Sequence, residues 1–230
     1  MDIDQFRKRI LFEDNHLIVV NKLAGEIVQG DKTGDESLLD TVKDYIKLTC
    51  NKSGNVFAGL VHRIDRPVSG AVIYTRTGKA LSRMTEQLKQ QKIIKSYWAV
   101  VASIPDPEEA ELEHFLLRNE KRNKTFIVEK QVQGAKQARL DYRLLYSADR
   151  YHLLYVRIHT GRHHQIRAQL SAIGCPIAGD LKYGAKRSNS DGSIGLHARS
   201  LEFDHPVGGS RILIEAPTPH VFPWNLFEGQ

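Results

Sequence analysis

Short runs of consecutive apolar residues recur along the chain and predict buried β-strands. We expect strands at residues 17–20, 71–74, 97–101, 140–146, 152–158, 196–203 and 212–215. The runs at 140–146 and 152–158 flank a polar stretch at 147–149, so these two strands are expected to pair as an antiparallel hairpin.

Three other segments have apolar positions at helical spacing. Residues 37–48 predict an amphipathic helix, and Ser37 with Asp40 resembles a capping box at its start. Residues 79–91 predict a second amphipathic helix. Residues 165–173 predict a shorter helix that ends before a glycine and a proline.

The order of these elements predicts the fold class. Many short strands with a few inserted helices, rather than a regular strand–helix alternation, indicate an α+β fold with a largely antiparallel sheet. No segment has the composition of a linker, so we expect a single domain over residues 1–230. A chain of this length buries a substantial core without disulfides or a structural metal.

The composition is that of a soluble globular protein, with 41% hydrophobic and 26% charged residues and a mean hydropathy of −0.39. The two cysteines, Cys50 and Cys175, form neither a disulfide framework nor a metal-binding spacing, which favours a cytoplasmic location. The acidic N-terminus lacks the apolar stretch of a signal peptide. No window approaches the roughly 18 apolar residues of a membrane span, so we expect no membrane partner.

The positive charge is unevenly distributed along the chain. The net charge is +6. Residues 1–50 carry 7 basic and 10 acidic side chains, a net of −3, whereas residues 51–100 carry 9 basic and 2 acidic side chains, a net of +7. A concentrated positive field suits a polyanionic partner such as RNA, although a solvated basic face would have the same composition.

One carboxylate lies among basic residues in the most basic part of the chain. Asp65 is flanked by Arg63 and Arg66, with His62 nearby, in a loop between two predicted strands. Opposite charges at short range favour the ionised form of a carboxyl group, which can act as a nucleophile or a base. The same residues could instead tie down the loop through ion pairs, and on the residues alone both interpretations stand.

A second polar segment, residues 159–167, lies where a predicted strand leads into a predicted helix. Arg162 and Arg167 are five residues apart and would not share a helix face, so one could reach a site while the other meets phosphate or solvent. Three histidines in this segment raise the alternative of a zinc site. Their spacing matches no zinc motif, and we expect no metal.

Two neighbouring aromatic residues, Tyr97 and Trp98, are predicted to point to opposite faces of a strand. One of them could stack on a nucleobase, or both could pack in the core. The sequence contains no glycine-rich phosphate loop, no dinucleotide-binding fingerprint and no nucleophile elbow, so we expect no nucleotide cofactor.

Together these segments resemble the RluA-type family of RNA pseudouridine synthases. The family signature H-R-L-D-x-x-T-S-G corresponds to residues 62–70, K-x-Y-x-A-x-V to 95–101, and G-R-T-H-Q-I-R to 161–167. Further matches are at residues 17–25, 179–184 and 196–206, so the resemblance covers roughly residues 12–220. The chain departs from the pattern at Ile64, Val68 and His163, none of which is expected to do chemistry.

The resemblance implies a role for each matching residue. Asp65 would be the catalytic nucleophile, and Arg167 would pair with it. Tyr97 would stack on the flipped uracil, and Arg63 would enter the RNA at the vacated position. His62, Arg66 and Arg162 would also bind substrate, and Leu196 would line the pocket wall. Asp65 would either attack the anomeric carbon or promote formation of a glycal, after the nucleotide has been extruded from the stack.

The resemblance also implies the fold, the partners and the cofactor requirement. The family's catalytic domain has a bent, mainly antiparallel mixed sheet flanked by helices, with the active site in a central cleft. No S4-type domain is expected, so residues 51–100 would hold the RNA. The substrate would be ribosomal or transfer RNA, no cofactor would be needed, and a monomer is expected. The alternative functions are an RNA-binding protein of the same fold without activity and a metal-dependent hydrolase.

Overall fold

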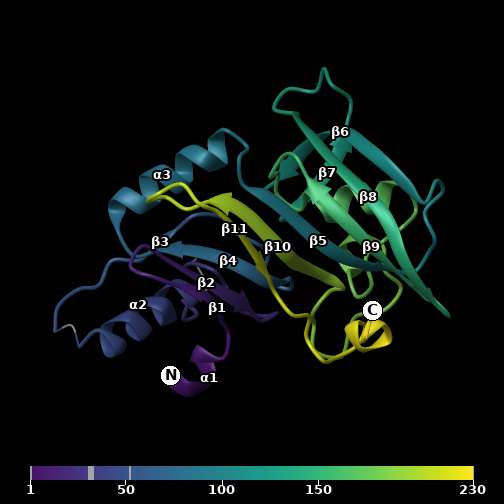
Figure 1. Cartoon of the computed structure of the whole chain (residues 1–230). Helices are drawn as coiled ribbons and strands as arrows, with labels where there is room; N and C mark the ends of the chain where they lie inside the picture. Colours follow the sequence, from purple (N-terminus) through teal and green to yellow (C-terminus); the bar gives the residue numbers. More distant parts are fainter. Residues whose placement is uncertain (1, 31–33, 52, 230) are drawn as a thin grey trace. The chain divides into compact units, whose positions relative to one another are not determined.

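The computed structural model describes residues 2–30, 34–51 and 53–229 (Figure 1). Its chain forms two compact units. Unit 1 comprises Met1–Ile93 and Ala198–Pro217, and unit 2 comprises Ile94–His197 and Thr218–Gln230. The expectation that residues 1–230 form one catalytic domain stays a prediction.

Unit 1 is a mainly antiparallel sheet with two long helices. Its strand order is β1-β2-β4-β10, with β3 paired to β4 and β11 paired to β10. The elements are α1 (Ile3–Arg7), β1 (Ile10–Glu13), β2 (Leu17–Lys22), α2 (Leu38–Thr49), β3 (Gly59–Leu60), β4 (Ser69–Thr75), α3 (Gly78–Lys89), β10 (Leu196–Asp204, of which all but the first two residues belong to unit 1) and β11 (Arg211–Glu215).

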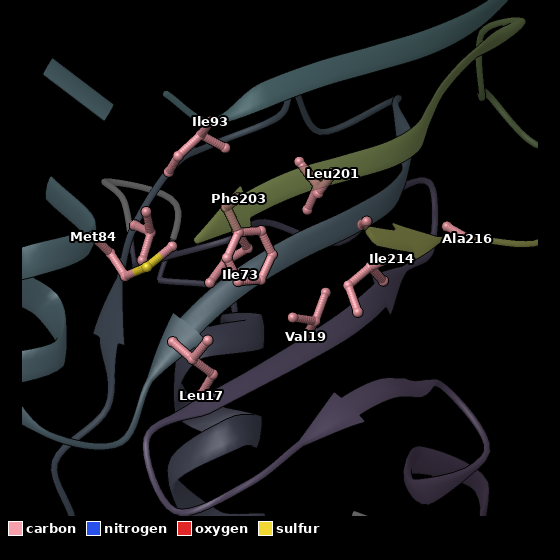
Figure 2. Packing of buried hydrophobic residues seen from close by; sticks show 11 residues of the cluster. Leu17, Val19, Ile73, Met84, Ile93, Leu201, Phe203, Ile214 and Ala216 are labelled. Atoms are coloured by element: carbon pink, nitrogen blue, oxygen red, sulfur yellow. The ribbon is translucent and has the colours of Figure 1, made fainter. Parts of the chain in front are cut away.

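The core of unit 1 explains why its strands have continuous apolar sequences. Leu17 and Val19 of β2 pack with Ile73 of β4 and with Met84 of α3 in one buried cluster (Figure 2). Ile18, which points to the other face of β2, is also fully buried. Strands that are covered on both faces have no polar side to alternate with, so they are apolar at every position.

Helix α2 begins at its predicted cap, and α3 begins at Gly78, one residue before its predicted start. Ser37 caps α2, and its Oγ accepts a hydrogen bond from the Asp40 amide at 3.3 Å, which confirms the predicted start. Thr77 caps α3 in the same way through the Ala80 amide, at 3.2 Å. The second helix ends at Lys89, two residues before the predicted end, and Gln91 adopts a left-handed conformation with φ of 57°.

Unit 2 is an antiparallel sheet with the strand order β5-β9-β8-β6-β7. Its elements are β5 (Ile94–Val101), β6 (Glu109–Asn119), β7 (Lys124–Val128), β8 (Lys136–Ala148), β9 (Tyr151–Ile158), α4 (Gln165–Ala172) and the short 3₁₀ helices η1 (Leu181–Tyr183) and η2 (Trp224–Phe227). The predicted hairpin is confirmed as β8 and β9, which are antiparallel neighbours. Helix α4 packs on this sheet, where Ala168 joins a buried cluster with Leu116 and Ala138.

Both units confirm an α+β fold with mainly antiparallel strands. Strands β1, β3, β6 and β7 were not predicted from the sequence. Within the described part of the chain, no helix is both long and apolar enough to cross a membrane.

Candidate active site

Asp65 is presented by a turn in unit 1, between β3 and β4. The Val68 amide donates to the Asp65 carbonyl oxygen at 3.0 Å and closes the turn. Asp65 is partly exposed, whereas Ile64 and Val68 on either side of it are buried. The turn is therefore anchored in the core at both ends while the carboxylate remains accessible.

A buried lysine lies under this turn. Lys22, the last residue of β2, is 0% exposed. Its Nζ donates to the carbonyl oxygens of Leu23 at 2.8 Å, Arg66 at 3.1 Å and Val68 at 2.7 Å. These bonds use all three donors of the ammonium group. Since two of the three carbonyls follow Asp65 in the turn, Lys22 fixes the backbone that carries Asp65.

Burial lowers the pKa of Lys22 to about 7, because the charged form loses its hydration. The negative charges of Glu26 and Asp65 favour the ammonium form, whereas the positive charges of Arg9 and Arg66 oppose it. Lys22 was not among the predicted site residues. The signal available in the sequence was its place at the end of an apolar strand, in the family-like segment 17–25.

The two arginines that flank Asp65 in the sequence make these contacts. The Arg66 Nη1 pairs with Asp35 Oδ2 at 2.9 Å, and its Nε donates to the Gly25 carbonyl at 2.9 Å. Arg63 is exposed, and among the described residues no carboxylate forms an ion pair with it. Substrate binding by Arg63 and Arg66 stays a prediction.

His62 is a buried residue. Its side chain is 8% exposed, and its Nε2 lies 3.3 Å from the Ile73 amide nitrogen, from which it accepts a hydrogen bond. This contact ties the segment before Asp65 to strand β4. Substrate binding by His62 stays a prediction.

Tyr97 and Trp98 point to opposite faces of β5 in unit 2, as predicted. Tyr97 lies opposite Val156 of β9 and is 7% exposed. Trp98 packs on the other side, against a buried cluster that includes Val100 and Trp224. Tyr97 is therefore the aromatic residue of this pair that belongs to the face covered by α4.

Arg167 of α4 is held by a carboxylate. Its Nε donates to Asp180 Oδ2 at 2.7 Å, and its Nη2 donates to Oδ1 at 2.9 Å. Both side chains are buried, at 5% and 1% exposure. The guanidinium carbon also lies 5.0 Å from the ring centroid of Tyr183. Asp180 was not predicted as a site residue, although the segment 179–184 had been noted for its family resemblance.

The N-terminus of α4 is fixed by His164, which caps the helix in a left-handed conformation with φ of 51°. The Thr125 amide donates to the Tyr183 hydroxyl at 2.8 Å, and this hydroxyl lies 2.9 Å from His164 Nδ1. Burial is the main cause that lowers the pKa of His164 to about 2, so the ring is neutral at ordinary pH. Tyr183 therefore joins α4 to strand β7.

The other two histidines of this segment also contact protein groups. His163 stacks on His164 with ring centroids 3.7 Å apart, and its Nδ1 lies 2.9 Å from Thr125 Oγ1. His159 Nε2 lies 2.7 Å from Asp141 Oδ2. In the described ranges, no group of three or more His, Cys, Asp or Glu residues is arranged to hold a metal ion.

The two remaining predicted residues lie in unit 2. Arg162 is exposed, and its Nε donates to the Gln137 carbonyl at 3.0 Å. Leu196 is buried at the start of β10. The predicted site residues thus divide between the units. His62, Arg63, Asp65 and Arg66 belong to unit 1, and Tyr97, Arg162, Arg167 and Leu196 belong to unit 2.

Comparisons with known proteins agree on one family. Residues 16–172 match the family model described as RNA pseudouridylate synthase. An uncharacterised RNA pseudouridine synthase of Bacillus subtilis is 31% identical over 222 residues, which cover 95% of this chain and 70% of that protein. Ribosomal large subunit pseudouridine synthase D of Nitrosomonas europaea is 33% identical over 222 residues, covering 92% of this chain and 62% of that protein.

A solved structure has the same fold. Human RNA pseudouridylate synthase domain containing 4 superposes with a TM-score of 0.80 at 23% identity, covering 94% of this chain and 91% of that chain. At this identity the likeness establishes the fold and no more.

Proposed function

This chain belongs to the RNA pseudouridylate synthase family, and we propose that it isomerises specific uridines in structured RNA to pseudouridine. The observation that carries the proposal is the match to the family model over residues 16–172, which include Asp65, Tyr97 and Arg167. The protein would bind RNA as its substrate and would need no cofactor.

The reaction breaks the bond between N1 of uracil and C1′ of the ribose, and it forms a bond between C5 and C1′. The hydrogen on C5 leaves as a proton, and N1 takes up a proton. No electrons are gained or lost, which agrees with a reaction that needs no redox cofactor. The target nucleotide must leave the stack before any side chain can reach C1′.

In this proposal Asp65 is the nucleophile. Its partial exposure on an anchored turn supports the role, because a nucleophile must be both accessible and held in place. Tyr97 stacks on the extruded uracil, Leu196 lines its pocket, and Arg167 keeps Asp65 ionised. The bidentate contact with Asp180 supports the last assignment, because it fixes the Arg167 guanidinium in one orientation.

The RNA is proposed to be held by basic side chains. Arg63, Arg66 and Arg162 are exposed, so their guanidinium groups can meet phosphate. Large-subunit ribosomal RNA is the first substrate to test, because the Nitrosomonas europaea relative is named as a ribosomal large subunit synthase. Transfer RNA is the second.

Tritium release tests the proposal. The substrate is RNA labelled with tritium at C5 of uracil, prepared from a strain that lacks the gene and separated into ribosomal and transfer RNA. The proposal predicts tritium release to solvent from one fraction, and a new pseudouridine at a defined site in that RNA. Binding of both fractions without release from either would contradict the enzymatic function and indicate an RNA-binding protein.

A further inference from the structure

Lys95 is a partly buried cation next to the loop that precedes α4. It lies on β5 two residues before Tyr97, so the two side chains leave the same face of the strand about 7 Å apart. A methyl group added at Gly161 would lie 3.4 Å from Lys95 Nζ, which places the ammonium beside the Gly161 backbone. Lys95 thus reaches from the Tyr97 face to this loop.

Lys95 lacks a counter-ion in its own unit. Among the described residues of unit 2, none forms a hydrogen bond or an ion pair with its ammonium group. Burial lowers the pKa of Lys95, and no charged neighbour contributes to the shift. Burying a cation without a partner costs stability, so such a residue is a candidate for binding an anion.

The loop that meets Lys95 is rigidly built. Gln165 is buried, and its Oε1 accepts from the Arg162 amide at 3.0 Å and from Thr160 Oγ1 at 2.7 Å. Its Nε2 donates to the Arg139 carbonyl at 3.1 Å. One side-chain amide therefore fixes both neighbours of Gly161 and ties them to strand β8.

Arg162 brings a second cation to this loop. Its Nε is bound to the Gln137 carbonyl, while the side chain is exposed to solvent. The acidic residue Asp141 is paired with His159, at 2.7 Å. Lys95 Nζ therefore lies beside Gly161, where the absence of a side chain lets a ligand approach the backbone, and the exposed Arg162 follows directly in the chain.

We propose that Lys95, Gly161 and Arg162 form a subsite for the phosphate of the nucleotide whose base stacks on Tyr97. The inference rests on the proposed function, and it adds the group that positions the extruded nucleotide. A nucleotide with its base on Tyr97 has its phosphate within the reach of a lysine two residues away on the same face. The RNA phosphate supplies the negative charge that Lys95 lacks in its own unit.

The test compares Lys95→Met with the wild type, using RNA labelled at C5 from a strain that lacks the gene. The subsite predicts an RNA Kd and KM higher by about 10- to 100-fold, with kcat changed much less. It also predicts that the slope of log Kd against log salt falls by about 0.7–0.9, the contribution of one phosphate contact. Lys95→Arg should keep most of the affinity, and the exposed Lys8→Met is the matched control.

Thermal unfolding separates this role from a structural one. Loss of an unpaired, partly buried cation should leave the melting temperature of Lys95→Met unchanged or raise it, even though RNA binding weakens. A second variant, Gly161→Ala, keeps both charges but places a methyl group beside Lys95 Nζ. It should also raise Kd, and combining it with Lys95→Met should add little.

An unchanged Kd and salt slope in Lys95→Met would overturn the subsite, and so would a fall in melting temperature that accounts for the lost binding. These outcomes are distinct from failure of the proposed function. If the wild type binds RNA but releases no tritium, the synthase assignment fails, and the Kd of Lys95→Met still decides the subsite.

Discussion

Each unit holds a candidate site segment with a buried cation, but the partners of the two cations differ. In unit 1, the partners of Lys22 among the described residues are main-chain carbonyl oxygens beneath Asp65. In unit 2, Arg167 donates to the carboxylate of Asp180. The first arrangement fixes a backbone turn, and the second fixes the orientation of a side chain.

The difference has electrostatic consequences. Carbonyl oxygens bind the Lys22 ammonium without cancelling its charge, so burial moves its pKa to about 7 and makes it sensitive to pH. The Arg167 guanidinium stays charged at any ordinary pH, and Asp180 neutralises it. The stability of unit 1 should therefore depend on the protonation of Lys22, and the stability of unit 2 should depend on the carboxylate of Asp180.

The largest effect is expected from Asp180→Ala, which removes the carboxylate that binds the buried Arg167 guanidinium through two hydrogen bonds. The free energy of unfolding should fall by about 3–5 kcal/mol, measured by urea denaturation. The double variant Asp180→Ala with Arg167→Met should recover part of the loss, because it removes the buried charge. A loss below about 1 kcal/mol in the single variant would mean that the pair does not behave as a buried one.

The next largest effect is a loss of stability at low pH, which is expected from the titration of His164. Its pKa in the native protein is about 2, compared with an ordinary value of 6.5 for histidine. Between these values the unfolded chain binds a proton that the native ring does not, so stability falls as pH decreases below about 6.5. The slope is at most about 1.4 kcal/mol per pH unit.

The variant His164→Asn lacks this titration and suits the left-handed backbone. Its unfolding free energy, measured by denaturation from pH 7 to pH 4, should approach that of the wild type as the pH falls. A difference between the two proteins that stays constant over this range would contradict a neutral, buried His164.

A smaller loss is expected for Lys22→Met. Three carbonyl oxygens lose their donor while the buried charge also disappears, so the net loss of unfolding free energy is about 1–3 kcal/mol at pH 7. Between the native pKa of about 7 and the ordinary lysine value of 10.5, the unfolded chain binds more protons than the native protein. The wild type should therefore gain stability relative to the variant as pH rises through this window.

Lys95→Met is the matched control for this prediction, because it removes a partly buried lysine that has no partner among the described residues of its unit. In denaturant unfolding at pH 7, Lys22→Met should lower the free energy of unfolding, whereas Lys95→Met should raise it or leave it unchanged. An equal loss in both would mean that the carbonyl contacts of Lys22 contribute nothing specific.

The smallest effect on stability is expected for Arg66→Gln. Its pair with Asp35 joins side chains that are 53% and 48% exposed, so the loss should stay below about 1 kcal/mol. RNA affinity, measured by filter binding, should nevertheless fall, because the exposed guanidinium is proposed to meet phosphate. An unchanged RNA affinity would contradict the proposal that Arg66 binds the substrate.

The fold could be predicted where local pattern and packing agree. Strands β2 and β4 have continuous apolar sequences because both of their faces are buried. Helix α2 begins at its predicted cap. Strand β6 was missed because its exposed face carries Glu109, Glu111 and Glu113, which made the segment look like an acidic run. The alternating Ala110 and Leu112 were the overlooked signal.

The site could be predicted only in part, because its supporting contacts are long-range. Asp65 was identified from the basic residues that neighbour it in the sequence. The contact between Lys22 and the Val68 carbonyl spans 46 residues, and no local pattern indicates it. Asp180 likewise meets Arg167 only after α4 and η1 fold back on each other. The neighbouring arginines gave no indication that Lys22 hydrogen-bonds to the backbone of the Asp65 turn.

The most direct test of the central claim is single-turnover tritium release by Asp65→Asn, with the exposed helix variant Asp44→Asn as the charge-matched control. Both are compared with the wild type on C5-labelled RNA at saturating enzyme. We predict no release by Asp65→Asn, undiminished RNA binding by the same variant, and wild-type release by Asp44→Asn. Release by Asp65→Asn at the wild-type rate would contradict the assignment of Asp65 as the nucleophile.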